Sequence, residues 1–481
     1  MEIISGLILP GLILRYYGSE VNGLIHSITE FLTIISFLDL GVGRVVETSL
    51  YEPLAFNDNE KISKIIASAA RFFRRLGIIL AVYVGILCFV YPAMIRPDLD
   101  ASCTVYLILI LSVSSFTQYF FSLTDERLLN ADQRIYIVHC VSVVSLLFSL
   151  LISVVLIRRG CPIYILKLAV AVFCLWKPVF LRIYVNRHYR LNRKIRFRGE
   201  PIRNKWYGLA QHLDYVVLKN TDYIILTFFS TLQNVSVYAV YHMILNGLCS
   251  LIMTFRSGFL SLMGELWAKK ETDALEKTFS WFEWIVHTVT IYLYGCAVIL
   301  IVPFVQIYAN GVSDAEYSQP LFAIILAVAF LFECFRAPYH TMTLAAGHFR
   351  ETQGCFYTAA ALNLCISVLS VQRFGLAGVV AGTMVALGYQ MIWMACYCTK
   401  HLIRNTGLIK RMFTDLLMIA LGIALSYGVQ MTETGIAGWL WLAVRIGLRW
   451  AVVVFGVNMI MHRDKLNKIR EIMKEKLVGN Q

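Results

Sequence analysis

Runs of about twenty apolar residues recur along this whole chain, and a helical run of that length crosses the roughly 30 Å apolar core of a bilayer. Within lipid, each segment has to satisfy its own backbone hydrogen bonds, and long runs without alternation do so as helices, not barrel strands. The chain has a mean hydropathy of +0.67 and 15% charged residues, whereas soluble domains carry about 25%. We therefore predict an all-α polytopic membrane protein.

The hydropathy pattern predicts about fourteen spans. The first is short for a span, so we expect either that neighbouring helices partly bury it or that the chain as given begins late. No basic region precedes it, so it is not typical of a cleavable signal peptide. The expected limits are 1–16, 22–47, 70–95, 102–126, 135–157, 162–185, 206–229, 233–258, 279–308, 319–340, 354–371, 375–399, 412–430 and 437–461.

Lys and Arg residues are spread unevenly over the predicted connections. If the amino terminus is cytoplasmic, most of the 43 basic residues fall in the even-numbered connections and the carboxyl tail, as the positive-inside rule requires. The sixth connection, around 187–205, is the richest. We therefore predict that both termini are cytoplasmic, and we assign the net charge of +13 to this bias and not to nucleic-acid binding.

An internal repeat relates residues 16–95 to residues 228–307. Matched pairs include Arg44 with Arg256 and Pro92 with Pro303. An even number of spans in each unit keeps both copies in the same orientation, as in transporters built from parallel repeats. The predicted organisation is a six-helix lobe with a basic cytoplasmic linker over 1–200, a second six-helix lobe over 201–405, and two extra helices with a basic tail over 406–481.

Several short stretches resemble one known family. They are Tyr16–Leu24 (YYGSEVNGL), Phe37–Gly43 (FLDLGVG), Leu50–Ala55 (LYEPLA) and, at the start of the second half, Thr221–Leu226 (TDYIIL). They resemble the polysaccharide transporters, the O-antigen-type flippases of the multidrug/oligosaccharidyl-lipid/polysaccharide exporter superfamily. The first helix is shorter than the family pattern.

The resemblance implies a flippase in the bacterial cytoplasmic (inner) membrane. It would carry an undecaprenyl-pyrophosphate-linked oligosaccharide to the outer leaflet by alternating access, for surface polysaccharide and exopolysaccharide biosynthesis. Its implied partners are that substrate, membrane lipids, a polysaccharide polymerase and assembly proteins, and we expect a monomer. Two alternatives stay open: an ion-coupled antiporter of drugs or organic cations from the same superfamily, and a membrane glycan polymerase or ligase, which would need a larger outer loop.

Moving a pyrophosphate requires cations inside the membrane, where charge is costly and usually faces a cavity or a partner. Arg suits phosphate because its planar guanidinium donates two hydrogen bonds at once. The alternative interpretations are binding of lipid head groups and, for the pair on the last span, snorkelling to the interface. The candidates for pyrophosphate binding are Arg44, Arg256, Lys219, Arg336, Arg445 and Arg449.

Four intramembrane carboxylates are candidates for coupling transport to H⁺ or Na⁺: Asp39, Asp214, Asp222 and Glu333. Lys219 with Asp222, and Glu333 with Arg336, are three residues apart and face the same side of a helix, so structural ion pairs are the alternative.

Catalytic and cofactor motifs are not evident in the sequence. There is no Walker loop and no spacing typical of metal ligands, so we expect a transporter and not an enzyme, without a cofactor. Most of the 12 cysteines lie in apolar runs, where they behave as small hydrophobic residues. Histidines such as His212 and His287 are scattered, and we interpret them as packed or interfacial residues.

Overall fold

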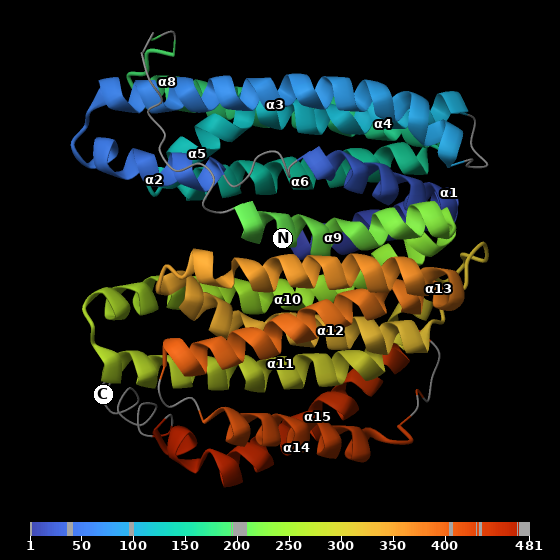
Figure 1. The fold of residues 1–481 in the computed structure, drawn as a ribbon. Helices are drawn as coiled ribbons and strands as arrows, with labels where there is room; N and C mark the ends of the chain where they lie inside the picture. The colour runs from blue at the N-terminus through green and yellow to red at the C-terminus, as the bar shows by residue number, and fades with distance from the viewer. Residues whose placement is uncertain are drawn as a thin grey trace, which may run out of the picture. The chain divides into compact units, whose positions relative to one another are not determined.

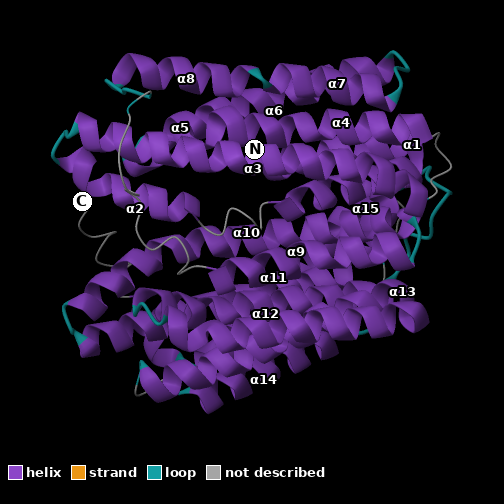
Figure 2. Cartoon of the chain, turned by 45° about the horizontal axis from the view of Figure 1, so that its top comes forward, coloured by secondary structure: helices purple, strands orange, loops and turns teal. Residues whose placement is uncertain are grey.

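Every regular element in the described part of the chain is a helix (Figure 2). The computed structural model describes residues 2–35, 42–95, 101–193, 195, 209–403, 407–429, 431, 435–468 and 470. Within these ranges, nine helices are long and apolar enough to cross a membrane. The predicted all-α membrane fold is therefore confirmed.

Two compact units divide the chain. Unit 1 comprises Met1–Val240, Gly311–Glu316 and Phe356–Val379, and unit 2 comprises Tyr241–Asn310, Tyr317–Cys355 and Val380–Gln481. The predicted division into lobes near residues 200 and 405 stays a prediction.

Unit 1 contains a series of helices in which α3 lies beside α4 and α2 beside α5 (Figure 1). Asp58 caps the start of α3 by accepting a hydrogen bond from the backbone N–H of Lys61 at 3.0 Å. The helices are α1 (Glu2–Thr33), α2 (Val42–Ala55), α3 (Asn59–Met94), α4 (Ala101–Thr117), the π-helix η2 (Gln118–Ser122), α5 (Leu123–Ala131), α6 (Ile135–Arg158), α7 (Ile163–Cys174), α8 (Trp176–His188) and α9 (Leu209–Phe229).

The first predicted span and the start of the second form one helix, α1, with a kink at Gly18. Gly18 has φ 85°, a conformation that favours glycine. The Asp314 carboxylate accepts hydrogen bonds from the Ser19 backbone N–H and from the Ser19 hydroxyl, both at 2.6 Å. A Cβ at position 18 would lie 2.9 Å from the Asp314 Oδ2 atom. The kink therefore leaves room for a carboxylate that binds the freed backbone.

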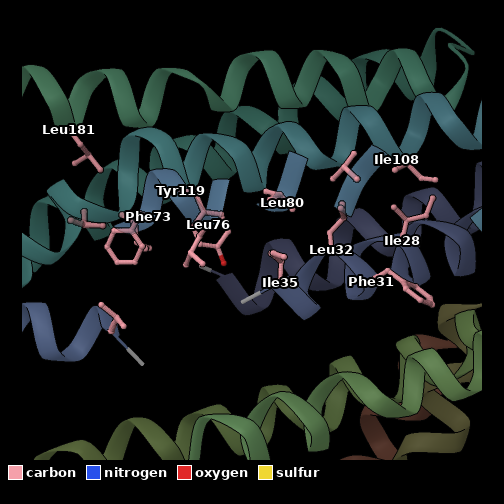
Figure 3. Packing of buried hydrophobic residues seen from close by; sticks show 14 of the residues in the cluster. Ile28, Phe31, Leu32, Ile35, Phe73, Leu76, Leu80, Ile108, Tyr119 and Leu181 are labelled. Carbon is pink, nitrogen blue, oxygen red and sulfur yellow. The ribbon is translucent and has the colours of Figure 1, made fainter. Parts of the chain in front are cut away.

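The core of unit 1 is formed where α1 meets α3 and α4. Figure 3 shows Ile28 and Leu32 of α1 close to Ile108 of α4, with Leu76 and Leu80 of α3 in the same apolar layer. These residues recur at the three- and four-residue spacing of one helix face. This apolar layer packs the kinked helix α1 against α3.

Unit 2 contains most of the remaining helices. The predicted spans 354–371 and 375–399 form one helix, α13, which is kinked at Gly375 with φ 53°; its part from 356 to 379 belongs to unit 1. The helices are α10 (Leu232–Ala268), whose start belongs to unit 1, α11 (Thr272–Tyr308), α12 (Pro320–Ala345), α13 (Phe349–His401), α14 (Leu408–Ser426) and α15 (Ile436–Met461).

The last two helices, α14 and α15, pack on α11 and on each other. Trp450 of α15 is 1% exposed and fills a slot formed by two glycines, Gly295 of α11 and Gly422 of α14. A Cβ at either glycine would lie 2.3 Å or 2.4 Å from the indole ring. The Trp284 indole N–H also donates to the Asn458 Oδ1 atom at 2.6 Å. These contacts pack α14 and α15 tightly within unit 2.

Candidate functional site

Arg256 lies half-buried on α10, beside the carboxyl-terminal part of α12. Its Nε atom donates to the Thr341 hydroxyl at 2.9 Å, and its Nη2 atom lies 3.3 Å from the His340 Nδ1 atom. A guanidinium, a hydroxyl and an imidazole thus meet at one place on unit 2. The hydroxyl and the imidazole hold the guanidinium in place, and a guanidinium suits an anionic oxygen ligand.

Arg336 is a buried residue of α12 with two strong partners. Its Nη2 atom donates to the Glu333 carboxylate at 2.7 Å and its Nη1 atom to the Gln390 side-chain oxygen of α13 at 2.6 Å. The three-residue spacing of Glu333 and Arg336 thus forms the ion pair that it predicts. The pairing neutralises Arg336, which favours a structural role for both residues.

Arg445 and Arg449 lie one turn apart on α15. Arg445 is half-buried, whereas Arg449 is exposed and its Nη1 atom donates to the Leu425 carbonyl of α14 at 2.8 Å. The surface beside Arg449 is apolar, because Leu448 and Val452 are 64% and 67% exposed. The Arg449 guanidinium thus lies on the exposed, apolar surface of α15.

The candidates in unit 1 are described in part. Lys219 is half-buried on α9 and close enough to Glu30 of α1 to interact with it electrostatically. Asp222, one turn further on, is fully buried and accepts a hydrogen bond from the Tyr238 hydroxyl at 3.0 Å. Asp39 lies outside the described residues, as do the side chains of Arg44 and Asp214. Their roles stay predictions.

A buried network of charged and titratable side chains, absent from our predicted sites, joins α11 to α14. The Arg411 Nη2 atom lies 3.3 Å from the Glu283 Oε2 atom, and the His287 Nδ1 atom lies 2.6 Å from the Asp415 Oδ2 atom. No side chain of the four is more than 7% exposed. We call these residues the α11–α14 clasp. Glu283 and His287 lie four residues apart on α11, and their partners Arg411 and Asp415 lie four residues apart on α14. The two contacts therefore join two successive turns of one helix to two successive turns of the other.

Two residues of α12 complete the surroundings of the clasp. The Tyr339 hydroxyl donates to the Glu283 Oε1 atom at 2.7 Å, and the Phe335 ring stacks on the His287 imidazole at 4.3 Å between centroids. One aromatic side chain of α12 thus covers each of the two contacts, and an unpaired charge in such buried surroundings is costly.

The sequence carried a signal for the clasp that our prediction did not use. Glu283 and His287 share one helix face, as do Arg411 and Asp415, at the same four-residue spacing. We set the thirteenth span at 412–430, which left Arg411 in a connection, whereas α14 begins at Leu408. The scattered positions of the histidines also led us to interpret His287 as a packed or interfacial residue.

A second ionic network surrounds α5 in unit 1. Asp125 is fully buried and accepts from Arg182 of α8 at 3.1 Å and from Arg193 of the basic connection at 2.8 Å. Its neighbour Glu126 pairs with Lys177 of α8 at 3.1 Å. Burial lowers the pKa of the Arg193 guanidinium, and Asp125 opposes that effect. The network anchors the start of the basic connection to α5.

Lys465, just beyond α15, binds the beginning of α11. Its Nζ atom donates to the Ser280 carbonyl at 2.6 Å and to the Ser280 hydroxyl at 2.8 Å. The amine lies 5.8 Å and 5.7 Å from the ring centroids of Trp281 and Trp284. Burial, aided by Arg411, lowers the pKa of Lys465 to about 7.

Comparison with known proteins identifies the fold. No family model and no curated protein matches this chain. The structure of the lipid II flippase MurJ, in an inward closed conformation, has a TM-score of 0.73 and 12% identity and covers 97% of this chain and 98% of its own. An inward-facing multidrug resistance MATE family transporter of the MOP superfamily has a TM-score of 0.63 and 15% identity, covering 83% and 95%.

Another similar structure is a MOP superfamily transporter from Pyrococcus furiosus whose binding pocket is described as reversed in polarity. Its TM-score is 0.54 at 14% identity, and it covers 82% of this chain and 94% of its own. The chain thus has the fold of MOP-superfamily transporters, as the resemblance in the sequence predicted.

Proposed function

We propose that this chain is a flippase that moves an undecaprenyl-pyrophosphate-linked oligosaccharide from the cytoplasmic to the outer leaflet by alternating access, for surface polysaccharide biosynthesis. The observation that carries the proposal is Arg449, an exposed cation on the apolar outer surface of α15. A charge on such a surface is costly and needs polar or anionic partners. The Leu425 carbonyl accepts one hydrogen bond from Arg449, and an anionic lipid group can accept others from the same guanidinium. A lipid-linked pyrophosphate supplies the anion and the apolar tail in one molecule.

The length of the structural match supports the same cargo class. The match to the lipid II flippase covers 97% of this chain, whereas the match to the MATE transporter covers 83%. The difference is close in size to the part of the chain that follows residue 407, which holds α14 and α15. These are the helices that carry Arg445 and Arg449.

Arg256 is the second pyrophosphate-binding candidate. Its guanidinium is held by the Thr341 hydroxyl and the His340 imidazole, which lie within hydrogen-bond distance of it, and a guanidinium donates well to phosphate oxygens. Lys219 and Arg336 are weaker candidates, because each lies beside a carboxylate, Glu30 and Glu333 respectively.

We further propose that intramembrane carboxylates couple transport to H⁺ or Na⁺. Asp222 leads this group because it is fully buried in unit 1 and interacts with the Tyr238 hydroxyl. Asp39, Asp214 and Glu333 complete the group. The same acidic residues favour the alternative function, an ion-coupled antiporter of organic cations, since a buried carboxylate attracts a positively charged cargo.

Native mass spectrometry of the protein purified in mild detergent tests the cargo. We expect a polyprenyl-pyrophosphate glycan to leave with the wild-type protein and to be lost in Arg449→Glu and Arg256→Glu. Lys269→Glu, a charge reversal at an exposed side chain, is the matched control and should retain the lipid. Retention of ordinary phospholipids alone, with saturable binding of organic cations, would favour the antiporter.

A further inference from the structure

The α11–α14 clasp does not balance its own charge when His287 is neutral. Glu283 and Arg411 cancel each other, and Asp415 then leaves one uncompensated negative charge among buried side chains. Burying an uncompensated carboxylate is costly, and a proton taken up nearby is the usual remedy. A second proton on His287 turns the pair into imidazolium and carboxylate and makes the clasp neutral.

Hydrogen bonding within the clasp favours that proton. The Asp415 Oδ2 atom lies 2.6 Å from His287 Nδ1, whereas the Asp415 Oδ1 atom and the His287 Nε2 atom are buried without a hydrogen-bond partner among the described residues. The Asp415 carboxylate thus depends on His287 alone, and a charge-assisted hydrogen bond from an imidazolium is the stronger form of that contact.

Titratable groups on the neighbouring helices do not supply the missing charge at neutral pH. From α12, Tyr339 donates to Glu283 and is neutral. Beyond α15, burial lowers the pKa of His462 to about 4, so its imidazole is neutral. Lys465, whose pKa is lowered to about 7, is partly uncharged and its amine binds Ser280. Lys410, which precedes Arg411, is exposed to solvent.

We propose that His287 and Asp415 form a proton-binding site, and that the bound proton secures the start of α14 on α11. The proton is taken from water by the imidazole of His287, the carboxylate of Asp415 holds the resulting cation, and no other bond changes. The site is separate from the pyrophosphate-binding candidates, and it does not depend on which cargo the protein carries.

Nitrogen-15 NMR of histidine-labelled protein in detergent tests the site directly. The His287 signal, assigned from its loss in His287→Gln, should show both ring nitrogens protonated in the wild type. In Asp415→Asn it should show a neutral imidazole, since the amide no longer stabilises an imidazolium. His348→Gln, which removes a histidine paired with the Tyr397 hydroxyl, is the control and should leave the His287 signal unchanged. A neutral His287 imidazole in the wild type would overturn the proposal.

Hydrogen exchange of the α14 amides tests the consequence for packing. Protection of the first turns of α14 should be lower in His287→Gln than in the wild type at the same pH. Equal protection in the two proteins would refute the link between proton and packing. If Asp415→Asn does not fold, the wild-type nitrogen-15 signal and His287→Gln together still decide the proposal.

Discussion

The two ionic networks, around Asp125 in unit 1 and around Glu283 in unit 2, use similar residues in different surroundings. Asp125 is fully buried, but its partners Arg182 and Arg193 keep 41% and 21% of their side-chain surface exposed. In the clasp, the Glu283 and Arg411 side chains are 1% and 5% exposed. The basic groups in unit 1 therefore remain partly exposed, whereas the basic group of the clasp depends on its protein partner.

This difference determines what each network does. An ion pair that is partly exposed contributes little to the free energy of unfolding, and removing one of its members therefore lowers stability only slightly. A dry pair contributes little net stability compared with apolar packing, but removing one member leaves a buried charge without a partner. We therefore interpret the Asp125 network as an anchor for the basic connection and the clasp as a contact that fixes α14 on α11.

Arg411→Ala should have the largest effect on stability. It leaves the Glu283 carboxylate buried without its cation, so we expect a loss of about 3–5 kcal/mol in the free energy of unfolding. Thermal unfolding of the purified protein in one detergent, followed by tryptophan fluorescence, measures the change.

The double variant Glu283→Gln/Arg411→Met is the control for that loss. It removes both charges, so it should recover much of the stability that Arg411→Ala loses. Equal instability of the single and double variants would show that the arginine acts through packing and not through its charge.

Asp125→Asn should cost less, about 1–2 kcal/mol, because Arg182 and Arg193 can turn towards water. We also expect faster proteolysis in the basic connection after Tyr189, since Arg193 loses its anchor. Limited proteolysis and thermal unfolding together measure both effects. A loss as large as that of Arg411→Ala would break the contrast between the two networks.

Lys465→Met should change the pH dependence of stability. The pKa of Lys465 is lowered from 10.5 to about 7 in the folded chain, so between these values the unfolded chain holds a proton that the folded chain has released. Wild-type stability should therefore rise with pH across this window relative to the variant. Unfolding temperatures of both proteins from about pH 7 to 10 test this; parallel curves would contradict it.

Glu265→Ala should have the smallest effect. Glu265 pairs with Lys269 at 2.5 Å on the last turn of α10, but both side chains are more than half exposed. Water replaces such a pair, so we expect no measurable shift in the unfolding temperature. A clear shift would mean that exposure is a poor guide to the cost of breaking ion pairs in this protein.

Hydrophobic run lengths were sufficient to predict an all-helical membrane fold, because a bilayer fixes both the length and the conformation of a span. The kinks were harder to predict from the sequence. Gly18 and Gly375 lie inside continuous helices, whereas the hydropathy pattern indicates two separate spans at each of these places. Their local backbone depends on tertiary partners such as Asp314, which is nearly three hundred positions from Gly18 in sequence.

Contacts between residues of different helices could not be predicted from the sequence for a similar reason. Spacing within one helix correctly indicated the contact between Glu333 and Arg336, since the helix fixes their distance. It cannot indicate that Glu283 meets Arg411, because that contact depends on which helices pack together. Even so, the matched four-residue spacing of acidic and basic residues on two spans was a usable signal.

Translocation in reconstituted vesicles tests the central claim most directly. Wild-type protein and Arg449→Ala would be compared in vesicles that carry a polyprenyl-pyrophosphate oligosaccharide, with arrival in the opposite leaflet measured by an enzyme that modifies only accessible glycan. The account predicts transfer by the wild type and slower transfer by the variant at equal amounts of folded protein. Wild-type vesicles that move no lipid-linked glycan but exchange organic cations for H⁺ or Na⁺ would contradict it.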